Sequence, residues 1–158
     1  SEPVTGPVVR RMIRRMNGDK SFALAFLLLA ACRGEEVARV KLAKPGDSGE
    51  VSWKGGPAKV WADYKGSWSG SNEKDPGFTY DIEVKEGTKT VTTLECKTAT
   101  CSSSVCSNTT KLNNNISANC ECLMGCALDV PEGKDYTLSV KVSGDRGEFE
   151  NASLVLRK

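Results

Sequence analysis

The sequence predicts an all-β protein, an immunoglobulin-like antiparallel β-sandwich that carries a disulfide-rich insert. Two observations support this fold class. Apolar and polar residues alternate with a period of two in several segments after residue 34, where no helical periodicity of useful length appears. In addition, six of the seven cysteines lie between Cys96 and Cys126, a density typical of a disulfide framework in an exported protein.

Three segments show the strand pattern most clearly. In residues 78–85 the apolar side chains fall on one face and the polar side chains on the other, as a half-buried antiparallel strand requires. Residues 136–142 repeat the pattern. Residues 143–147 then predict a hairpin loop that leads into a returning strand at residues 149–156.

The remaining strands are predicted from weaker patterns. Residues 59–64 alternate in the same way, and residues 88–96 are rich in threonine and valine. Residues 37–42 and 50–53 are weaker candidates. Clusters of glycine, proline and aspartate separate the segments, as turns require. About seven short strands in one domain indicate a sandwich.

Residues 1–34 are predicted to form a leader, and residues 35–158 a single β-sandwich domain. In the leader, basic residues precede the apolar run 21–31, which is too short to span a membrane, and small residues follow. This arrangement is typical of a secretory signal peptide. There are two alternatives. Residues 29–32 resemble a bacterial lipobox, in which Cys32 would carry lipid, or the run forms a short buried helix.

The charge of the domain differs from that of the whole chain. Six of the 22 basic residues and two of the 20 acidic residues lie in residues 1–34, which leaves the domain with a net charge of about −2. No basic stripe remains, so we expect no nucleic-acid partner. A signal peptide together with paired cysteines predicts an extracellular or lumenal location, of which the lysosomal lumen is one.

The cysteine-rich insert is predicted to form disulfide-bonded, glycosylated surface loops. The cysteines expected to pair are Cys96, Cys101, Cys106, Cys120, Cys122 and Cys126. Structural zinc is a weaker alternative, because such sites more usually use paired CxxC elements. Three Asn-x-Ser/Thr motifs, at Asn108, Asn115 and Asn151, predict N-linked glycosylation, and the first two lie within the insert.

The composition argues against an enzyme. Histidine is absent, which excludes a Ser-His-Asp or Cys-His nucleophilic site and a histidine metal site. Asp81 and Glu83 share a strand face, but a solvated polar face explains them better than a carboxylate pair for glycoside hydrolysis. No Gly-rich phosphate-binding loop appears. We therefore expect no catalytic residues, no cofactor and no bound metal.

Aromatic residues are concentrated in one stretch of this polar chain, from Trp53 to Tyr80. If residues 59–64 form a strand, Trp61 faces away from Val60. In one interpretation these rings pack the core and Trp61 covers an edge. In the other, the sheets splay and the aromatic faces line a cavity for an apolar ligand.

A second apolar feature lies in the insert. Leu123 and Met124 are held between Cys122 and Cys126, where an apolar pair is awkward to bury. The pair either plugs the core or touches a lipid surface or gates a pocket.

The run from Cys96 to Leu156 resembles the lysosomal ganglioside-activator branch of the ML (lipid-recognition) family. That family also includes the mite group 2 allergens and the Niemann-Pick type C cholesterol carrier. The matching features are a strand that ends in Cys96, the Cys-x-Cys of residues 120–122, a Pro-Glu-Gly turn before residue 136, and a Ser-Gly-Asp-Arg turn before the last strand. The resemblance implies a sandwich that holds a lipid between its sheets.

The same resemblance implies a disulfide pairing. Cys96 would pair with Cys101, Cys106 with Cys122, and Cys120 with Cys126. Activator proteins also join the start of the domain to its last strand by a disulfide. Both cysteines of that bridge are absent here. Asn151 lies near the position expected in the last strand, and no cysteine lies between Cys32 and Cys96. The ends of the domain are therefore expected to be looser by about 2–5 kcal/mol.

These observations together predict a secreted lipid-binding or lipid-transfer protein that buries a lipid or other apolar molecule between two β-sheets. Transient contact with a membrane surface would accompany this role. The residues expected to bind the lipid are Trp61, Trp68, Phe78, Tyr80, Leu123 and Met124. The alternative is a secreted immunoglobulin- or fibronectin-like protein-binding module with a filled core and no lipid cavity.

Overall fold

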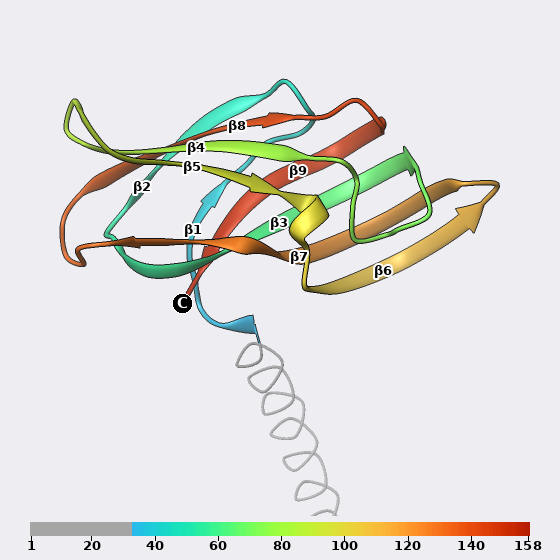
Figure 1. Cartoon of the computed structure of the whole chain (residues 1–158), viewed down its shortest axis with the longest axis horizontal. Helices are drawn as coiled ribbons and strands as arrows, with labels where there is room; N and C mark the ends of the chain where they lie inside the picture. Colours follow the sequence, from blue (N-terminus) through green and yellow to red (C-terminus); the bar gives the residue numbers. More distant parts are fainter. Residues whose placement is uncertain (1–32) are drawn as a thin grey trace, which may run out of the picture. The chain divides into compact units, whose positions relative to one another are not determined.

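The computed structural model describes residues 33–158 (Figure 1). The compact unit within this part runs from Glu36 to Lys158. Its strands are β1 Glu36–Val40, β2 Ser48–Trp53, β3 Gly56–Ser69, β4 Thr79–Glu86, β5 Lys89–Lys97, β6 Ser103–Leu112, β7 Asn115–Val130, β8 Tyr136–Ser143 and β9 Gly147–Arg157. A short 3₁₀-helix, η1 Thr98–Thr100, follows β5. The predicted signal peptide and Cys32 lie outside the described residues.

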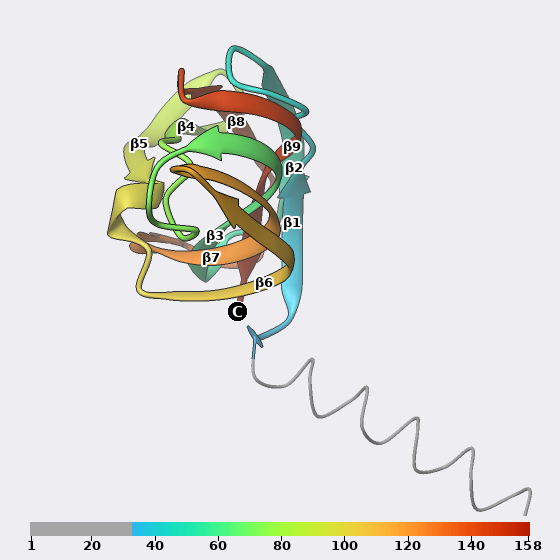
Figure 2. The same cartoon turned by 90° about the vertical axis from the view of Figure 1, so that its right-hand side faces the viewer.

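The strands form two antiparallel sheets that pack face to face (Figures 1 and 2). Sheet A has the order β1-β9-β3-β7-β6, and sheet B has the order β2-β8-β4-β5. The all-β sandwich predicted from the sequence is confirmed, whereas its immunoglobulin-like character stays a prediction. Within residues 33–158, no helix is long and apolar enough to cross a membrane.

The segments with period-two alternation form strands close to their predicted bounds. The predicted strand 78–85 is β4, and the predicted strand 136–142 is β8. Strand β3 is much longer than predicted, because Tyr64 and Trp68 continue the inward-facing side chains to its end. The same alternation turns Trp61 to the opposite face from Val60, as the sequence predicted.

The cysteine-rich insert differs from the prediction, because it forms a β-hairpin of β6 and β7 rather than surface loops. In β7 the even-numbered residues 116–124, including the cysteines at 120 and 122, are all buried. Cysteine therefore serves as an inward-facing apolar residue of a period-two strand. Asn113 and Asn114 both have positive φ angles and form the two-residue turn that joins the strands.

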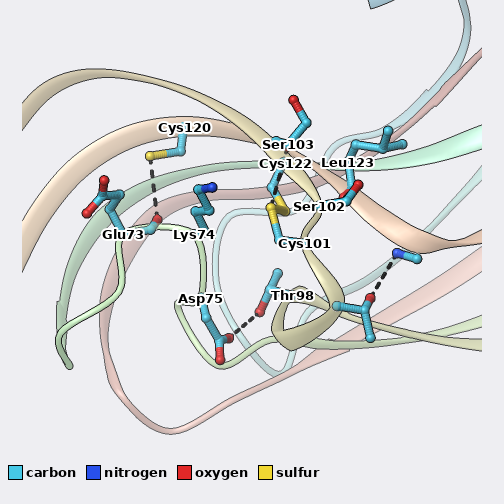
Figure 3. The surroundings of a disulfide bond; sticks show 12 residues. Glu73, Lys74, Asp75, Thr98, Cys101, Ser102, Ser103, Cys120, Cys122 and Leu123 are labelled. Atoms are coloured by element: carbon cyan, nitrogen blue, oxygen red, sulfur yellow. Dashed lines mark hydrogen bonds between the residues drawn. A yellow bond between two sulfur atoms is a disulfide. The ribbon is translucent and has the colours of Figure 1, made fainter.

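The six cysteines of the insert form three disulfides, but the pairing implied by the family resemblance is wrong. The bridges are Cys96–Cys126, Cys101–Cys122 and Cys106–Cys120. They are nested one inside the next, and each has one end on β7. The antiparallel register of β6 on β7 sets Cys106 opposite Cys120. Cys96 lies on β5 and Cys101 lies between η1 and β6, so their bridges depend on how these segments pack against β7. Figure 3 shows the middle bridge, Cys101–Cys122.

The two ends of the domain are joined by strand pairing rather than by a disulfide. Strand β1 pairs antiparallel with β9, with Glu36 opposite Arg157. Arg39 of β1 also forms an ion pair with Asp63 of β3 across the sheet face.

Candidate binding site

The structure divides the six predicted lipid-binding residues between the interior of the sandwich and the outer face of sheet A. Four of them, Trp68, Phe78, Tyr80 and Met124, lie between the sheets, and each is at most 2% exposed. The other two, Trp61 and Leu123, lie on the outer face of sheet A, where they are directly paired across β3 and β7. The sequence therefore grouped residues that the fold separates.

The interior at this end of the sandwich is filled by aromatic rings in mutual contact. The rings of Phe78 and Phe149 are 4.5 Å apart between centroids, and Tyr64 and Trp68 are 5.6 Å apart. Tyr80 of sheet B donates a hydrogen bond from its hydroxyl to the carbonyl oxygen of Ala152 in sheet A, at 3.2 Å. Because these side chains pack against each other across both sheets, they form the aromatic part of the core at this end of the sandwich.

Residues 70–78, which connect β3 and β4, are held next to this aromatic cluster by side-chain hydrogen bonds. Thr98 is fully buried, and its hydroxyl donates to Asp75 Oδ1 at 2.8 Å while it accepts the backbone N–H of Phe78 at 2.9 Å. Figure 3 shows Thr98 beside Asp75, close to the Cys101–Cys122 bridge. The Tyr64 hydroxyl donates to the carbonyl oxygen of Glu73 at 2.9 Å. Side-chain hydrogen bonds therefore hold this connection against the core.

Burial changes the ionisation of the two tyrosines in this cluster. The pKa of Tyr64 is raised above its ordinary value by burial and by the neighbouring Asp75 and Glu73 carboxylates. Burial likewise raises the pKa of Tyr80 well above its ordinary value. Both hydroxyls are therefore neutral hydrogen-bond donors at physiological pH.

On the outer face of sheet A, Trp61 lies at the centre of an apolar row. Val155 of β9 pairs with it on one side, and Leu123 of β7 pairs with it on the other. The guanidinium of Arg157 lies 6.0 Å from the Trp61 ring centroid, within the range of a cation–π contact. As a result Trp61 is only 6% exposed although it lies outside the core.

A groove with a volume of about 490 Å³ lies on sheet A beside this row. Its lining residues are Pro57, Ala58, Lys59, Ala127, Leu128, Asp129, Glu132, Arg157 and Lys158. The groove forms where Lys59 of β3 pairs with Ala127 on one side and with Arg157 on the other. Pro57 and Ala127 form its exposed apolar floor, and the side chains of Ala58 and Leu128 lie beneath it in the core. Three cationic and two acidic side chains surround this floor.

The charges around the groove are partly neutralised by neighbours. Arg157 forms ion pairs with Glu121 at 3.4 Å and Glu36 at 3.7 Å, and Lys158 pairs with Glu132. The hydrogen bond from Lys158 lowers the pKa of Glu132 below its ordinary value. Lys59, in contrast, is exposed and forms no ion pair with any other residue in 33–158. Lys59 is therefore the cation in the groove that is available to an anionic ligand.

A larger and more polar depression, of about 840 Å³, covers the outer face of sheet B. Four carboxylates line it, from Glu50, Asp81, Glu83 and Glu95, against one cation, Lys141. Asp81 lies directly between Lys141 on β8 and Glu95 on β5. Asp81 and Glu83 do share a strand face, as the sequence predicted, and that face is the outer face of the sheet.

The three predicted glycosylation sites lie in different surroundings. Asn108 and Asn115 are exposed on the β6–β7 hairpin. Asn151 on β9 is half-buried, and its Oδ1 accepts hydrogen bonds from the backbone N–H of Ser153 at 3.2 Å and from the Ser153 hydroxyl at 2.6 Å. Glycosylation at all three stays a prediction.

Sequence reasoning did not find the groove. Ala127 lies in the insert, which was expected to be loops, and Lys59 and Arg157 are far apart in the sequence. The available signal was the exposed side of β3, where Pro57, Lys59 and Trp61 alternate with buried residues. This pattern on β3 indicates one side of the groove, but it does not indicate that β7 and β9 supply the other sides.

Within residues 33–158, no group of three or more histidine, cysteine, aspartate or glutamate side chains could hold a metal ion. No protein-family model matches the chain, and no match is found among curated proteins.

Proposed function

We propose that the protein is a secreted, non-catalytic binding protein that holds an apolar or amphipathic small molecule, such as a fatty acid, in the groove on the outer face of sheet A. The observation that supports this proposal is the groove itself, which has an exposed apolar floor of Pro57 and Ala127 with Lys59 exposed at its side. The proposal keeps the ligand class that the ML resemblance implies and moves the site from between the sheets to the outside.

The size and chemistry of the groove support this function. Small-molecule sites usually have volumes of about 300–1,000 Å³ and combine a mostly apolar lining with a few polar groups. The groove, at about 490 Å³, falls in this range. An acyl chain on the floor would gain about 0.8 kcal/mol for each buried CH₂ group, and its carboxylate would face Lys59. Three disulfides in the described chain are compatible with an extracellular location.

The test uses a fluorescent fatty acid and its methyl ester as probes. Ala127→Glu places a carboxylate on the groove floor from an exposed position, so it should abolish uptake of both probes without disturbing the core. Ala99→Glu makes the same change at an exposed alanine on η1 and serves as the control. Lys59→Glu should weaken binding of the acid by about tenfold or more and change binding of the neutral ester much less.

The location of the ligand decides between this proposal and the family expectation. Uptake that is unaffected by Ala127→Glu, with NMR shift changes at Trp68 and Phe78, would place the ligand between the sheets instead. No uptake of either probe by the unmodified protein would remove small-molecule binding altogether.

The depression on sheet B favours a second candidate, a module that binds a protein. Its lining residues carry a net charge of −3, since four carboxylates face one lysine. A partner with a basic surface is complementary to it. A lysine-rich peptide should then shift the NMR signals of Asp81 and Glu95, and Asp81→Lys should remove the effect. A peptide that binds equally well to Asp81→Lys contradicts this candidate.

A further inference from the structure

Strand β6 forms one edge of sheet A and pairs with β7 alone (Figure 1). Cys106 lies directly opposite Cys120, and their Cα atoms are 4.1 Å apart. In antiparallel sheets a spacing near 4.5 Å marks a pair without mutual backbone hydrogen bonds, whereas hydrogen-bonded pairs are about 5.5 Å apart. The backbone N–H and C=O groups of Cys106 therefore point away from β7.

The register of the ladder extends this assignment to Ser104. Ser104 pairs with Cys122, two residues along from the Cys106–Cys120 pair, and hydrogen-bonded and non-hydrogen-bonded pairs alternate along an antiparallel ladder. This places the hydrogen-bonded pairs at the odd-numbered residues of β6. The even-numbered residues Ser104 and Cys106 consequently direct their backbone donors and acceptors to the free edge of the sheet.

The segment from Ser103 to Ser107 lacks the devices that usually protect an edge strand. Such edges are commonly blunted by charged side chains, proline or a bulge. This segment contains no charge and no proline, and Val105 on it is 48% exposed. The bulge begins only after Ser107, near Asn108, whose φ angle is 54°. The disulfide Cys106–Cys120 fixes the segment in its extended conformation against β7.

The other edge strands in the described part of the chain are charged. Strand β5 carries lysines at both of its ends, as well as Glu95. Strand β1 carries Glu36 and Arg39, and β2 carries Glu50. The segment 103–107 therefore differs from these strands, because it has unpaired backbone groups and no charged side chain that would repel a second strand.

We propose that this segment pairs with the same segment of a second copy, which joins two A sheets edge to edge in a closed two-fold dimer. Antiparallel pairing centred on Val105 sets Ser104 of each copy opposite Cys106 of the other. These are the residues whose backbone groups face outward, so both pairs exchange N–H···O bonds.

The proposed dimer interface is self-complementary at its centre, Val105. Val105 of one copy faces Val105 of the other at a pair where side chains lie closest, and both lose exposed apolar surface. The bulge after Ser107 turns the strand away and limits the pairing to the segment 103–107. The contact uses the same patch on both copies and so closes as a dimer rather than growing into a fibre.

The first experiment measures self-association by sedimentation velocity over a series of protein concentrations, with Ser104→Pro as the main variant. Proline at position 104 removes an outward N–H and leaves the ladder to β7 intact, which edge strands tolerate. It should raise the dimer dissociation constant roughly 30-fold, because each copy loses one intermolecular hydrogen bond. An intact near-ultraviolet circular dichroism spectrum and three disulfides by mass spectrometry show that the variant is folded.

A charge substitution provides an independent test. Val105→Lys sets two ammonium groups against each other at the two-fold axis and should weaken the dimer by about tenfold or more. Val91→Lys is the matched control, because Val91 is also exposed, at 39%, but lies on β5. It should leave the dissociation constant unchanged.

Amide hydrogen exchange identifies the interface directly. Protection of the Ser104 and Cys106 amides should rise with protein concentration, because both point to solvent in a single copy. A protein that stays monomeric with these amides unprotected overturns the proposal. So does a dimer that persists unchanged in both Ser104→Pro and Val105→Lys.

Discussion

Cys96 on β5 and Cys126 on β7 are joined by a disulfide that crosses between the two sheets, with 5.9 Å between their Cα atoms. The bridge Cys106–Cys120, in contrast, lies within sheet A, between neighbouring strands. The three nested bridges thus join sheet B, the η1 connection and the edge strand β6 to the single strand β7.

As the single bridge of the insert, the bridge between the sheets should stabilise the fold more than the bridge within sheet A. With the other four cysteines of the insert replaced by alanine, Cys96–Cys126 closes a loop with a sequence separation of 30 and should contribute about 3–4 kcal/mol in the chain-entropy model. Cys106–Cys120 alone closes a loop of 14 and should contribute about 3 kcal/mol. Urea unfolding before and after reduction measures both contributions. The reverse order would show that the edge bridge stabilises the fold more.

Neighbouring residues Leu123 and Met124 should respond differently to truncation. Met124 is 2% exposed between the sheets, so Met124→Ala leaves a cavity and should cost about 2–5 kcal/mol. Leu123 is half-buried on the outer face, so Leu123→Ala should cost clearly less. Denaturant midpoints of the two variants give the comparison. Equal losses would contradict the assignment of the two side chains to opposite faces.

The buried hydroxyl of Thr98 should contribute to stability through its hydrogen bonds. Thr98→Val keeps the shape of the side chain but leaves the Phe78 N–H without its acceptor, at a cost of about 1–3 kcal/mol. Thr93→Val is the control, because Thr93 is exposed on β5. Thermal melting of both variants tests the prediction, and a Thr98→Val protein as stable as the control would refute it.

Stability should fall at alkaline pH because of Tyr64 and Tyr80. Burial raises the pKa of both above the ordinary value of 10.0, so each folded hydroxyl holds its proton more tightly than in the unfolded chain. Their contribution is fully present below about pH 10 and is lost as the pH rises through the folded pKa. Urea midpoints measured from pH 8 to pH 11 should decline above pH 10. In Tyr64→Phe the decline should be shallower, and an identical slope would argue against this tyrosine as its source.

Much of the strand pattern was predictable because a half-buried strand alternates its side chains locally. The direction of Trp61, opposite to Val60, followed from this alternation alone. The pattern of β7 is equally regular, but its inward positions are partly cysteines, which also indicate disulfide-bonded loops. Counting cysteine as an apolar residue extends the alternation along β7 from Ile116 to Met124, whereas β6 has no such pattern.

The sequence by itself determined the fold class, the period of the strands and the set of six cysteines in the insert that are available for pairing, because these are local or compositional properties. The tertiary structure alone decided which cysteines meet, since six cysteines allow 15 pairings and the packing of β5, η1 and β6 against β7 selects one. It also decided that aromatic rings from both sheets fill the interior. The groove has the same origin, because Lys59, Ala127 and Arg157 become neighbours only when three strands distant in sequence pair side by side.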